Sequence, residues 1–156
     1  MITIRAEAIM DKVLFYLDPL INEGMQTGSL VVAMNLWTAA REALVKQVTS
    51  SGGKLTGNLE ASMSFRKMST GISTYALSEM YVDTNKAPYA EWIELGKYAA
   101  NIPYQNTEGR DYRNSKFSGH HYLQTAIRKV GKIAAPTVAE TILKKLSNPA
   151  IAGDII

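Results

Sequence analysis

The chain contains no cysteine, only five prolines and two tryptophans, and no long hydrophobic run. Without cysteine it can form neither a disulfide scaffold nor a thiolate metal site. No apolar stretch approaches the roughly 18 residues that a membrane-spanning helix needs, and no basic and apolar leader opens the sequence. We therefore predict a soluble protein that is made in the cytoplasm and uses no cofactor or metal.

An excess of charge of one sign is also nearly missing, since 17 Lys and Arg residues face 14 Asp and Glu residues, for a net charge of +3. This mild excess permits contact with nucleic acid or an acidic partner without requiring it. A chain of 156 residues, 46% of them hydrophobic, can bury a core without metal or disulfide support. We predict one domain over residues 1–156.

The first third of the chain predicts two helices. Apolar residues recur four apart over residues 6–17, which is typical of an amphipathic helix, and Asp18-Pro19 is expected to end it. Residues 22–28 contain two glycines and predict a loop. Ser29 is a suitable N-cap for a second helix over residues 30–48.

The middle of the chain predicts an antiparallel hairpin. After a break at Gly52-Gly53, apolar and polar residues alternate over residues 59–66 and again over residues 74–83. A period of two is typical of strands with one buried face. Residues 69–71 supply a polar turn between the two strands.

A short helix is predicted at residues 89–95. Pro88 disfavours helix in the residue before it, and Gly96 can adopt the left-handed conformation that ends a helix. Tyr89 and Trp92 share one face of this helix. We expect Trp92 to be buried against the strand pair and Gly96 to have a positive φ.

The last third predicts a long loop followed by a long helix. Residues 97–118 are polar and show neither period. From Gly119 the period returns to 3.6, and Pro136 is expected to interrupt the helix near Ala135. Residues 147–156 show no period and form a flexible tail in this prediction. The fold class is therefore α+β, with an antiparallel sheet packed against N-terminal helices and a long C-terminal helix.

Two groupings of side chains could carry chemistry. Glu91 and Glu94 are spaced i, i+3, a pairing that general acid and base catalysis can use, although paired glutamates on helices often serve structure alone. The long loop mixes basic and aromatic side chains that suit contact with a protein or with nucleic acid. The candidate interface residues in this loop are Tyr104, Arg110, Tyr112, Arg113, Lys116 and Phe117.

Three short segments carry a resemblance to a known family through their order and spacing. Their distinguishing residues are Leu55, Gly57 and Leu59 before the first predicted strand, Tyr89, Trp92, Glu94 and Gly96 in the middle of the chain, and Tyr122 and Leu123 in the last helix. Together these segments resemble the bacteriophage tail-completion or head-tail joining proteins, which are minor tail or neck proteins of long-tailed phages. The resemblance extends over residues 30–146.

The resemblance implies a virion protein without catalytic activity that forms a ring between the head connector and the tail tube. The implied partners are copies of the chain itself, expected as a hexamer, the connector or adaptor proteins, the tail tube or tail terminator protein, and DNA that passes through the lumen without tight binding. The implied location is the head-tail interface of a virion made in the host cytoplasm. A ring subunit needs surface for its neighbours, and the long loop and the apolar tail with Ile155 and Ile156 are candidates.

Two other functions stay open at this stage. One is a small basic module that binds nucleic acid, whose affinity would fall steeply with salt. Its cations would be Arg110, Arg113, Lys116, Arg128, Lys129 and Lys132. The other is an enzyme that uses Glu91 and Glu94, which requires a pocket beside both carboxylates.

Overall fold

The chain divides into two compact units, and its longest helix and its strand pair contribute residues to both. A computed structural model describes residues 6–52, 57–68, 77–96 and 117–147, with side chains described from Leu17 onward. The first unit holds Met1–Val32, Lys67–Glu79 and Ile133–Ile156, and the second holds Ala33–Arg66 and Met80–Lys132.

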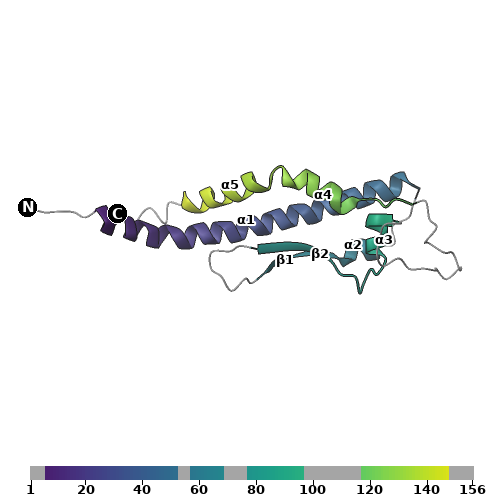
Figure 1. Cartoon of the computed structure of the whole chain (residues 1–156), viewed down its shortest axis with the longest axis horizontal. Helices are drawn as coiled ribbons and strands as arrows, with labels where there is room; N and C mark the ends of the chain where they lie inside the picture. The colour runs from purple at the N-terminus through teal and green to yellow at the C-terminus, as the bar shows by residue number, and fades with distance from the viewer. Residues whose placement is uncertain (1–5, 53–56, 69–76, 97–116, 148–156) are drawn as a thin grey trace, which may run out of the picture. The chain divides into compact units, whose positions relative to one another are not determined.

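Figure 1 shows the helices and strands of the described residues. In chain order they are α1 (Ala6–Ser50), α2 (Asn58–Ser62), β1 (Met63–Met68), β2 (Leu77–Val82), α3 (Ala90–Leu95), α4 (Tyr122–Gly131) and α5 (Ala134–Leu146). The two strands pair as an antiparallel sheet, and α1 packs on this sheet and on a C-terminal helix. The predicted α+β class is confirmed.

The N-terminal part of the chain is one helix of 45 residues, so the prediction of two helices separated by a loop at residues 22–28 is wrong. Pro19 lies inside α1, where a proline removes a backbone N–H and costs about 3 kcal/mol. Ser29 does not cap a helix. Its hydroxyl donates to the Gln26 carbonyl over 3.1 Å and lies 2.8 Å from the Ser78 hydroxyl on β2.

The two glycines of the predicted loop explain why α1 continues. Gly24 and Gly28 are four residues apart and therefore share one helix face. A Cβ on Gly24 would lie 2.8 Å from the Cα of Ile142, and a Cβ on Gly28 would lie 2.9 Å from the Cα of Val138. A glycine costs a helix about 1 kcal/mol relative to alanine, but here it lets the backbone of α5 approach α1 closely.

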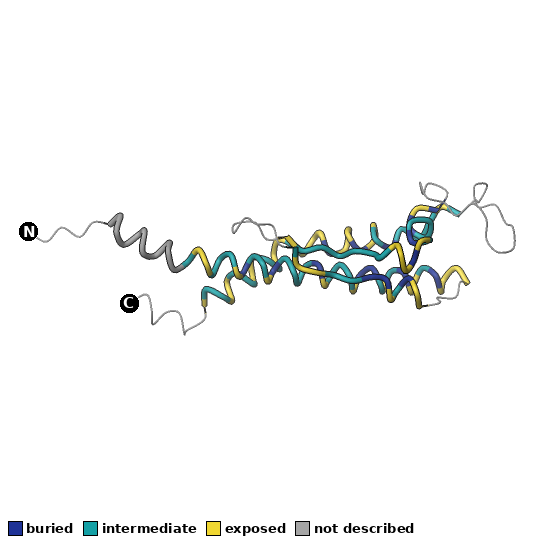
Figure 2. The backbone as a smooth tube through the Cα atoms, turned by 90° about the horizontal axis from the view of Figure 1, so that it is seen from below, coloured by how far each residue is buried: buried dark blue, intermediate teal, exposed yellow. Residues whose placement is uncertain are grey.

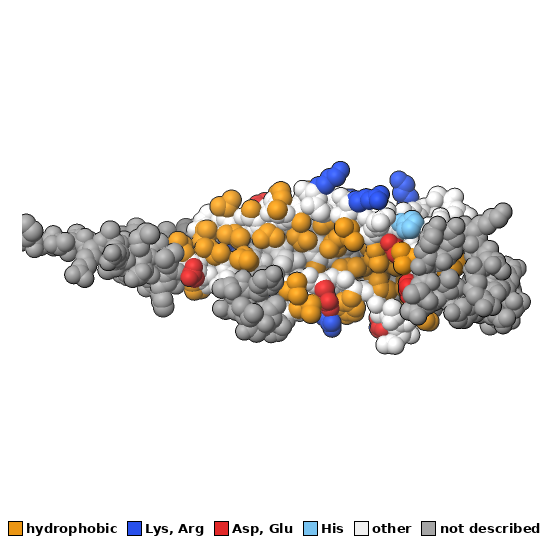
Figure 3. All heavy atoms as spheres, in the orientation of Figure 1, with side chains coloured by type: hydrophobic (Ala, Val, Ile, Leu, Met, Phe, Trp, Pro, Cys, Tyr) orange, Lys and Arg blue, Asp and Glu red, His pale blue; other side chains and the backbone are white. Residues whose placement is uncertain are grey.

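In the first unit, α5 leaves much of its apolar surface open. None of its residues is buried. Leu143 is 64% exposed, and Ile133, just before the helix, is 48% exposed. Figure 3 shows hydrophobic side chains gathered over α5 and the neighbouring part of α1. An ion pair between Lys145 and Glu23 also joins these two helices.

The second unit contains a core made mainly of small and medium side chains, with Tyr122 as its largest fully buried member. Figure 2 shows that buried positions recur along α1. The buried hydrophobic residues of this unit are Ala33, Ala39, Ala40, Leu44, Val48, Leu59, Met63, Ala87, Ala90, Tyr122, Ala126 and Val130. Because so many are alanines, the backbones of α1, α3 and α4 can approach one another.

The first strand begins later than predicted. The alternation over residues 59–66 predicted a strand throughout, but α2 occupies its first half and β1 begins only at Met63. In a helix the side chains no longer alternate, so Ala61 is exposed and Ser62 is buried. The second strand falls inside its predicted range. The predicted turn at residues 69–71 lies outside the described residues.

The predicted C-terminal helix is interrupted, as expected from Pro136, but the interruption comes slightly before Ala135. The helices α4 and α5 are separated by Lys132 and Ile133. A proline ring clashes with the carbonyl four residues earlier, which here belongs to Lys132, so α4 cannot run through Pro136. The first turn of a helix tolerates proline, and Pro136 lies in the first turn of α5.

Candidate functional site

The middle and last of the three resembling segments meet where α3 ends and α4 begins. The N–H of His120 donates to the carbonyl of Ile93 over 2.7 Å, and the N–H of His121 donates to the carbonyl of Glu94 over 3.1 Å. These bonds hold the end of α3 against the chain that enters α4. We call residues 92–96 and 117–124 the α3–α4 joint. The joint brings together the two residues that flank segment 97–116.

Glu94 caps α4 from outside that helix. Its side chain accepts hydrogen bonds from two backbone N–H groups, those of Leu123 at 2.9 Å and Gln124 at 3.1 Å, one on each carboxylate oxygen. The first N–H groups of a helix have no partner within the helix, and its dipole favours a negative charge there. His121, the residue before α4, makes no side-chain cap. Glu94 is only 9% exposed, which makes these bonds strong.

Two glycines let the backbones of the joint touch. Gly96 has φ 59°, which confirms the predicted positive φ, and Gly119 has φ 89°. A Cβ on Gly96 would lie 2.3 Å from the backbone O of Phe117, and a Cβ on Gly119 would lie 2.2 Å from the backbone O of Glu94. Each glycine is therefore required both for its backbone conformation and for the space it leaves. His121 also has a positive φ of 51°.

Aromatic rings cover one side of the joint. The rings of Trp92 and Phe117 are 4.7 Å apart, and His120 meets Phe117 edge-on at 4.9 Å. Trp92 is half-buried, and its ring packs on the ring of Phe117. Phe117, a predicted interface residue of the long loop, thus packs within the fold. Burial, and then the nearby charge of His121, lowers the pKa of His120.

Tyr122 is fully buried beneath the Glu94 cap. Within the described ranges its hydroxyl has no hydrogen-bond partner. Burial, followed by the nearby charge of Glu94, raises the pKa of Tyr122 well above its ordinary value of 10.0. The fold therefore holds this side chain as a neutral phenol whose hydroxyl adds little to stability.

We expect Tyr122→Phe to leave the free energy of unfolding unchanged or to raise it by up to about 1 kcal/mol, because the hydroxyl loses water on folding without gaining a partner. Tyr122→Ala, which empties the site, should cost about 3 to 5 kcal/mol. Urea unfolding at pH 7 measures both. A loss above about 1 kcal/mol in the phenylalanine variant would show that the hydroxyl has a partner in the native protein.

The same variant tests the pKa shift of Tyr122. Because the folded pKa is raised, this group stabilises the fold fully below about pH 10 and loses that contribution as pH rises above it. The unfolded phenol releases its proton there, while the folded one retains it. Stability measured from pH 8 to pH 11 should fall less steeply in Tyr122→Phe than in the natural chain.

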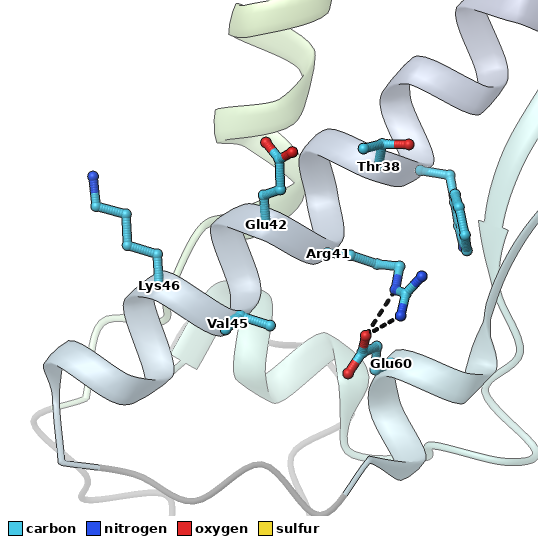
Figure 4. Close-up of a pocket in the computed structure, with 7 residues that line it drawn as sticks. Thr38, Arg41, Glu42, Val45, Lys46 and Glu60 are labelled. Carbon is cyan, nitrogen blue, oxygen red and sulfur yellow. Dashed lines mark hydrogen bonds and ion pairs between the residues drawn. The ribbon is translucent and has the colours of Figure 1, made fainter.

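A second grouping in the same unit joins α1 to α2 (Figure 4). Arg41 forms an ion pair with Glu60, with a 2.9 Å hydrogen bond from its Nε, and its guanidinium lies 4.6 Å from the centre of the Trp37 ring. The indole N–H of Trp37 donates to the Met63 carbonyl over 3.1 Å. The hollow beside these residues measures about 440 Å³. Its arginine and glutamate bind each other, so this ion pair links α1 to α2.

The remaining predicted residues fall into two groups. Gly57 precedes α2 with φ 81°, Leu59 is buried, and the carbonyl of Tyr89 accepts the N–H of Ile93 over 3.0 Å. The others lie outside the described residues: Leu55, Tyr104, Arg110, Tyr112, Arg113, Lys116, Ile155 and Ile156.

Sequence reasoning missed two contributors to the joint. Gly119 was read only as the start of a helix period, although a glycine between a loop and a helix can readily adopt a positive φ. The capping role of Glu94 was missed because its partners are 29 and 30 residues away. The available signal was that His121, the residue before α4, is not one of the usual N-cap residue types, so α4 needs a cap from elsewhere.

Comparison of this chain with models of protein families, with curated proteins and with solved structures gives no match in any of the three. Among the described residues, no helix combines the length and apolar character needed to cross a membrane. Those residues also hold no group of three or more histidines and carboxylates arranged to bind a metal.

Proposed function

We propose that this chain is a non-enzymatic structural subunit of a bacteriophage virion, located at the head-tail interface. Copies of it form a ring, which we expect to be a hexamer, between the head connector or adaptor and the tail tube or terminator. DNA passes through the lumen of the ring without tight binding. The subunit is made in the host cytoplasm before it joins the particle.

The observation that carries this proposal is the α3–α4 joint. Its two halves are the segments that resemble the tail-completion family, although they are separated by residues 97–116. The resembling residues bond directly, since Glu94 caps the helix that contains Leu123. Proteins often present a binding loop as a segment inserted between two elements that are held rigidly together.

Exposed apolar side chains also support an assembly role. In the first unit Ile133 and Leu143 are 48% and 64% exposed, and Figure 3 shows hydrophobic side chains gathered over α5. Monomers seldom leave large apolar patches in water unless a partner covers them. By contrast, both oxygens of Glu94 accept backbone N–H groups, so this carboxylate is poorly placed to move protons with Glu91.

The test is deletion of residues 104–116 in the natural phage, with Phe117 kept because it packs on Trp92. The melting temperature of the purified subunit should stay nearly unchanged, because His120 and His121 bond directly to α3 and bring the ends of the segment together. The deleted phage should yield filled heads without joined tails, which electron microscopy and plaque counts would detect.

Gly131→Ala is the matched control, because Gly131 is helical with open space around its Cβ position. This variant should assemble normally. Infectious particles from the deleted phage would contradict the assembly role of the segment. If the free subunit instead binds duplex DNA, with log K falling by about 0.9 per phosphate contact per log unit of salt, the nucleic-acid module becomes the better assignment.

A further inference from the structure

In the second unit, an apolar groove of about 200 Å³ lies between β2 and α4, and every residue that lines it belongs to that unit. Leu36 and Ala40 of α1 line it, and Leu123 and Ile127 of α4 form one side. Ile127 is 61% exposed, so the groove is open to solvent. It is smaller than most pockets for whole small molecules, which measure roughly 300 to 1,000 Å³, and it suits a few aliphatic side chains.

The other side of the groove is the edge of β2 that faces away from β1. Three consecutive residues, Met80, Tyr81 and Val82, line the groove. Side chains alternate between the two faces of a strand, so three in a row reach one groove only if it runs along the strand edge. In the part of the chain that the structure describes, β2 pairs with β1 alone, so the groove follows the edge that β1 does not occupy.

The register of the hairpin shows which backbone groups point along this edge. Asp83, directly after β2, donates its N–H to the carbonyl of Ser62 over 2.8 Å, so its backbone faces β1. In an antiparallel pair the backbone groups of successive residues point to opposite sides of the strand. Tyr81 therefore also faces β1, whereas Met80 and Val82 direct their N–H and C=O groups toward the groove. Polar backbone groups beside apolar side chains are the partners that an added strand needs.

A cation lies beside the groove on α4. Arg128 directly follows Ile127, is exposed, and donates to the side chain of Gln124 over 3.4 Å. Gln124 in turn follows Leu123, so this bond holds the guanidinium along the flank of α4 next to the groove. The amide of Gln124 carries no charge, and within the described ranges Arg128 has no ion pair. A carboxylate on the occupant would therefore complement it.

We propose that the groove binds an extended segment of a partner protein as a strand added along β2, with aliphatic side chains in the groove and a carboxylate against Arg128. The backbone of the segment pairs with Met80 and Val82, and its alternate side chains enter the groove beside Ile127. A lipid chain would fill the groove but leave these backbone groups without partners, so the strand edge favours a peptide. The inference does not rest on the virion role, because it follows from the strand edge, the groove and the charge alone.

A fluorescently labelled heptapeptide with blocked ends, Glu-Val-Thr-Val-Thr-Val-Glu, tests the contact on the full-length chain. When the peptide is extended its valines point to one side, and a glutamate at each end can meet Arg128 in either strand direction. Fluorescence anisotropy should show saturable binding. Ile127→Asp should raise the dissociation constant at least about tenfold, because it places a charge in an apolar contact. This variant should fold normally since the side chain is largely exposed, and circular dichroism checks that it does.

Charge reversal tests the role of Arg128. Arg128→Glu should weaken binding of the glutamate peptide roughly threefold and strengthen binding of the same peptide with lysine at both ends, as expected for an exposed ion pair. Lys46→Glu is the matched control, because Lys46 is also exposed but lines the separate hollow between α1 and α2. It changes the net charge by the same amount and should alter the binding of both peptides little.

Hydrogen exchange followed by NMR gives a readout that is specific to strand addition. The peptide should slow exchange of the amides of Met80 and Val82, while the amide of Tyr81, which already faces β1, should change little. Methylating alternate nitrogen atoms of the peptide backbone gives two further probes. Only one of them should lose affinity, by at least about tenfold, because a strand addresses its neighbour with every second N–H.

Three results would overturn the proposal. The first is no saturable binding of either peptide up to about 1 mM. The second is binding that leaves exchange at Met80 and Val82 unchanged, and decanoate that displaces the peptide would then identify a lipid chain as the occupant. The third is self-association of the chain that Ile127→Asp abolishes and that excludes the peptide, which would make a second copy the occupant. None of these results bears on particle assembly, which the deletion of residues 104–116 tests separately.

Discussion

Replacing Gly119 by alanine should lower the free energy of unfolding by about 2 to 5 kcal/mol. A residue with a Cβ pays about 1 to 2 kcal/mol at a left-handed φ, and Gly119 has φ 89°. The new Cβ would also lie 2.2 Å from the backbone O of Glu94, so two backbone segments would have to separate. Overpacking against backbone adds about 1 to 3 kcal/mol. Urea unfolding followed by circular dichroism measures the change.

Other glycines separate the two contributions. Gly57 has φ 81° but open space around its Cβ position, so Gly57→Ala should show the conformational cost alone, about 1 to 2 kcal/mol. Gly131 is helical and equally unobstructed, so Gly131→Ala should stabilise the protein by about 1 kcal/mol. If Gly119→Ala cost no more than Gly57→Ala, the close backbone contact in the joint would be wrong.

Local signals in the sequence predicted local structure well. The short helix before Gly96 was predicted from a proline start and a glycine stop, and both act within a few residues of the helix they bound. The interruption near Pro136 was predicted for the same reason. In each case the signal acts on backbone within about four residues along the chain, so no knowledge of the fold is needed to predict the break.

Long-range contacts overruled the local signals elsewhere. Pro19, Gly24 and Gly28 all disfavour helix, yet α1 runs through them because Gly24 and Gly28 pack against α5, more than 100 residues later in the chain. Glycines four apart could have suggested a close helix contact. A single sequence does not show which partner helix would use it.

The same limit applies to the candidate site. Glu94 was singled out as half of a carboxylate pair, and its structural role was the more ordinary interpretation. What the sequence could not show is that the side chain would meet the start of α4, because that contact depends on the bonds of His120 and His121 to α3. The contacts that hold the joint together can therefore be identified only from the three-dimensional structure.

Glu94→Ala is expected to lower the free energy of unfolding by about 3 kcal/mol. The substitution removes two charge-assisted hydrogen bonds, each worth about 1.5 to 3 kcal/mol before any compensation by water. Loss of a helix cap alone costs about 1 kcal/mol. Glu94→Gln should fall between the natural chain and the alanine variant, because the amide replaces one of the two acceptor oxygens by an NH2 group that cannot accept. Glu42→Ala, at an exposed ion pair with Lys129, is the control and should change stability little.

Hydrogen exchange can place the loss at α4. In Glu94→Ala the amides of Leu123 and Gln124 lose their acceptors, so they should exchange much faster than in the natural chain, while amides in the middle of α1 should change only as far as global stability does. If the protein lost stability without faster exchange at these two amides, Glu94 would act through packing instead of capping. If both amides stayed protected at unchanged stability, another group would be their acceptor, and the direct bond between α3 and α4 would have to be discarded.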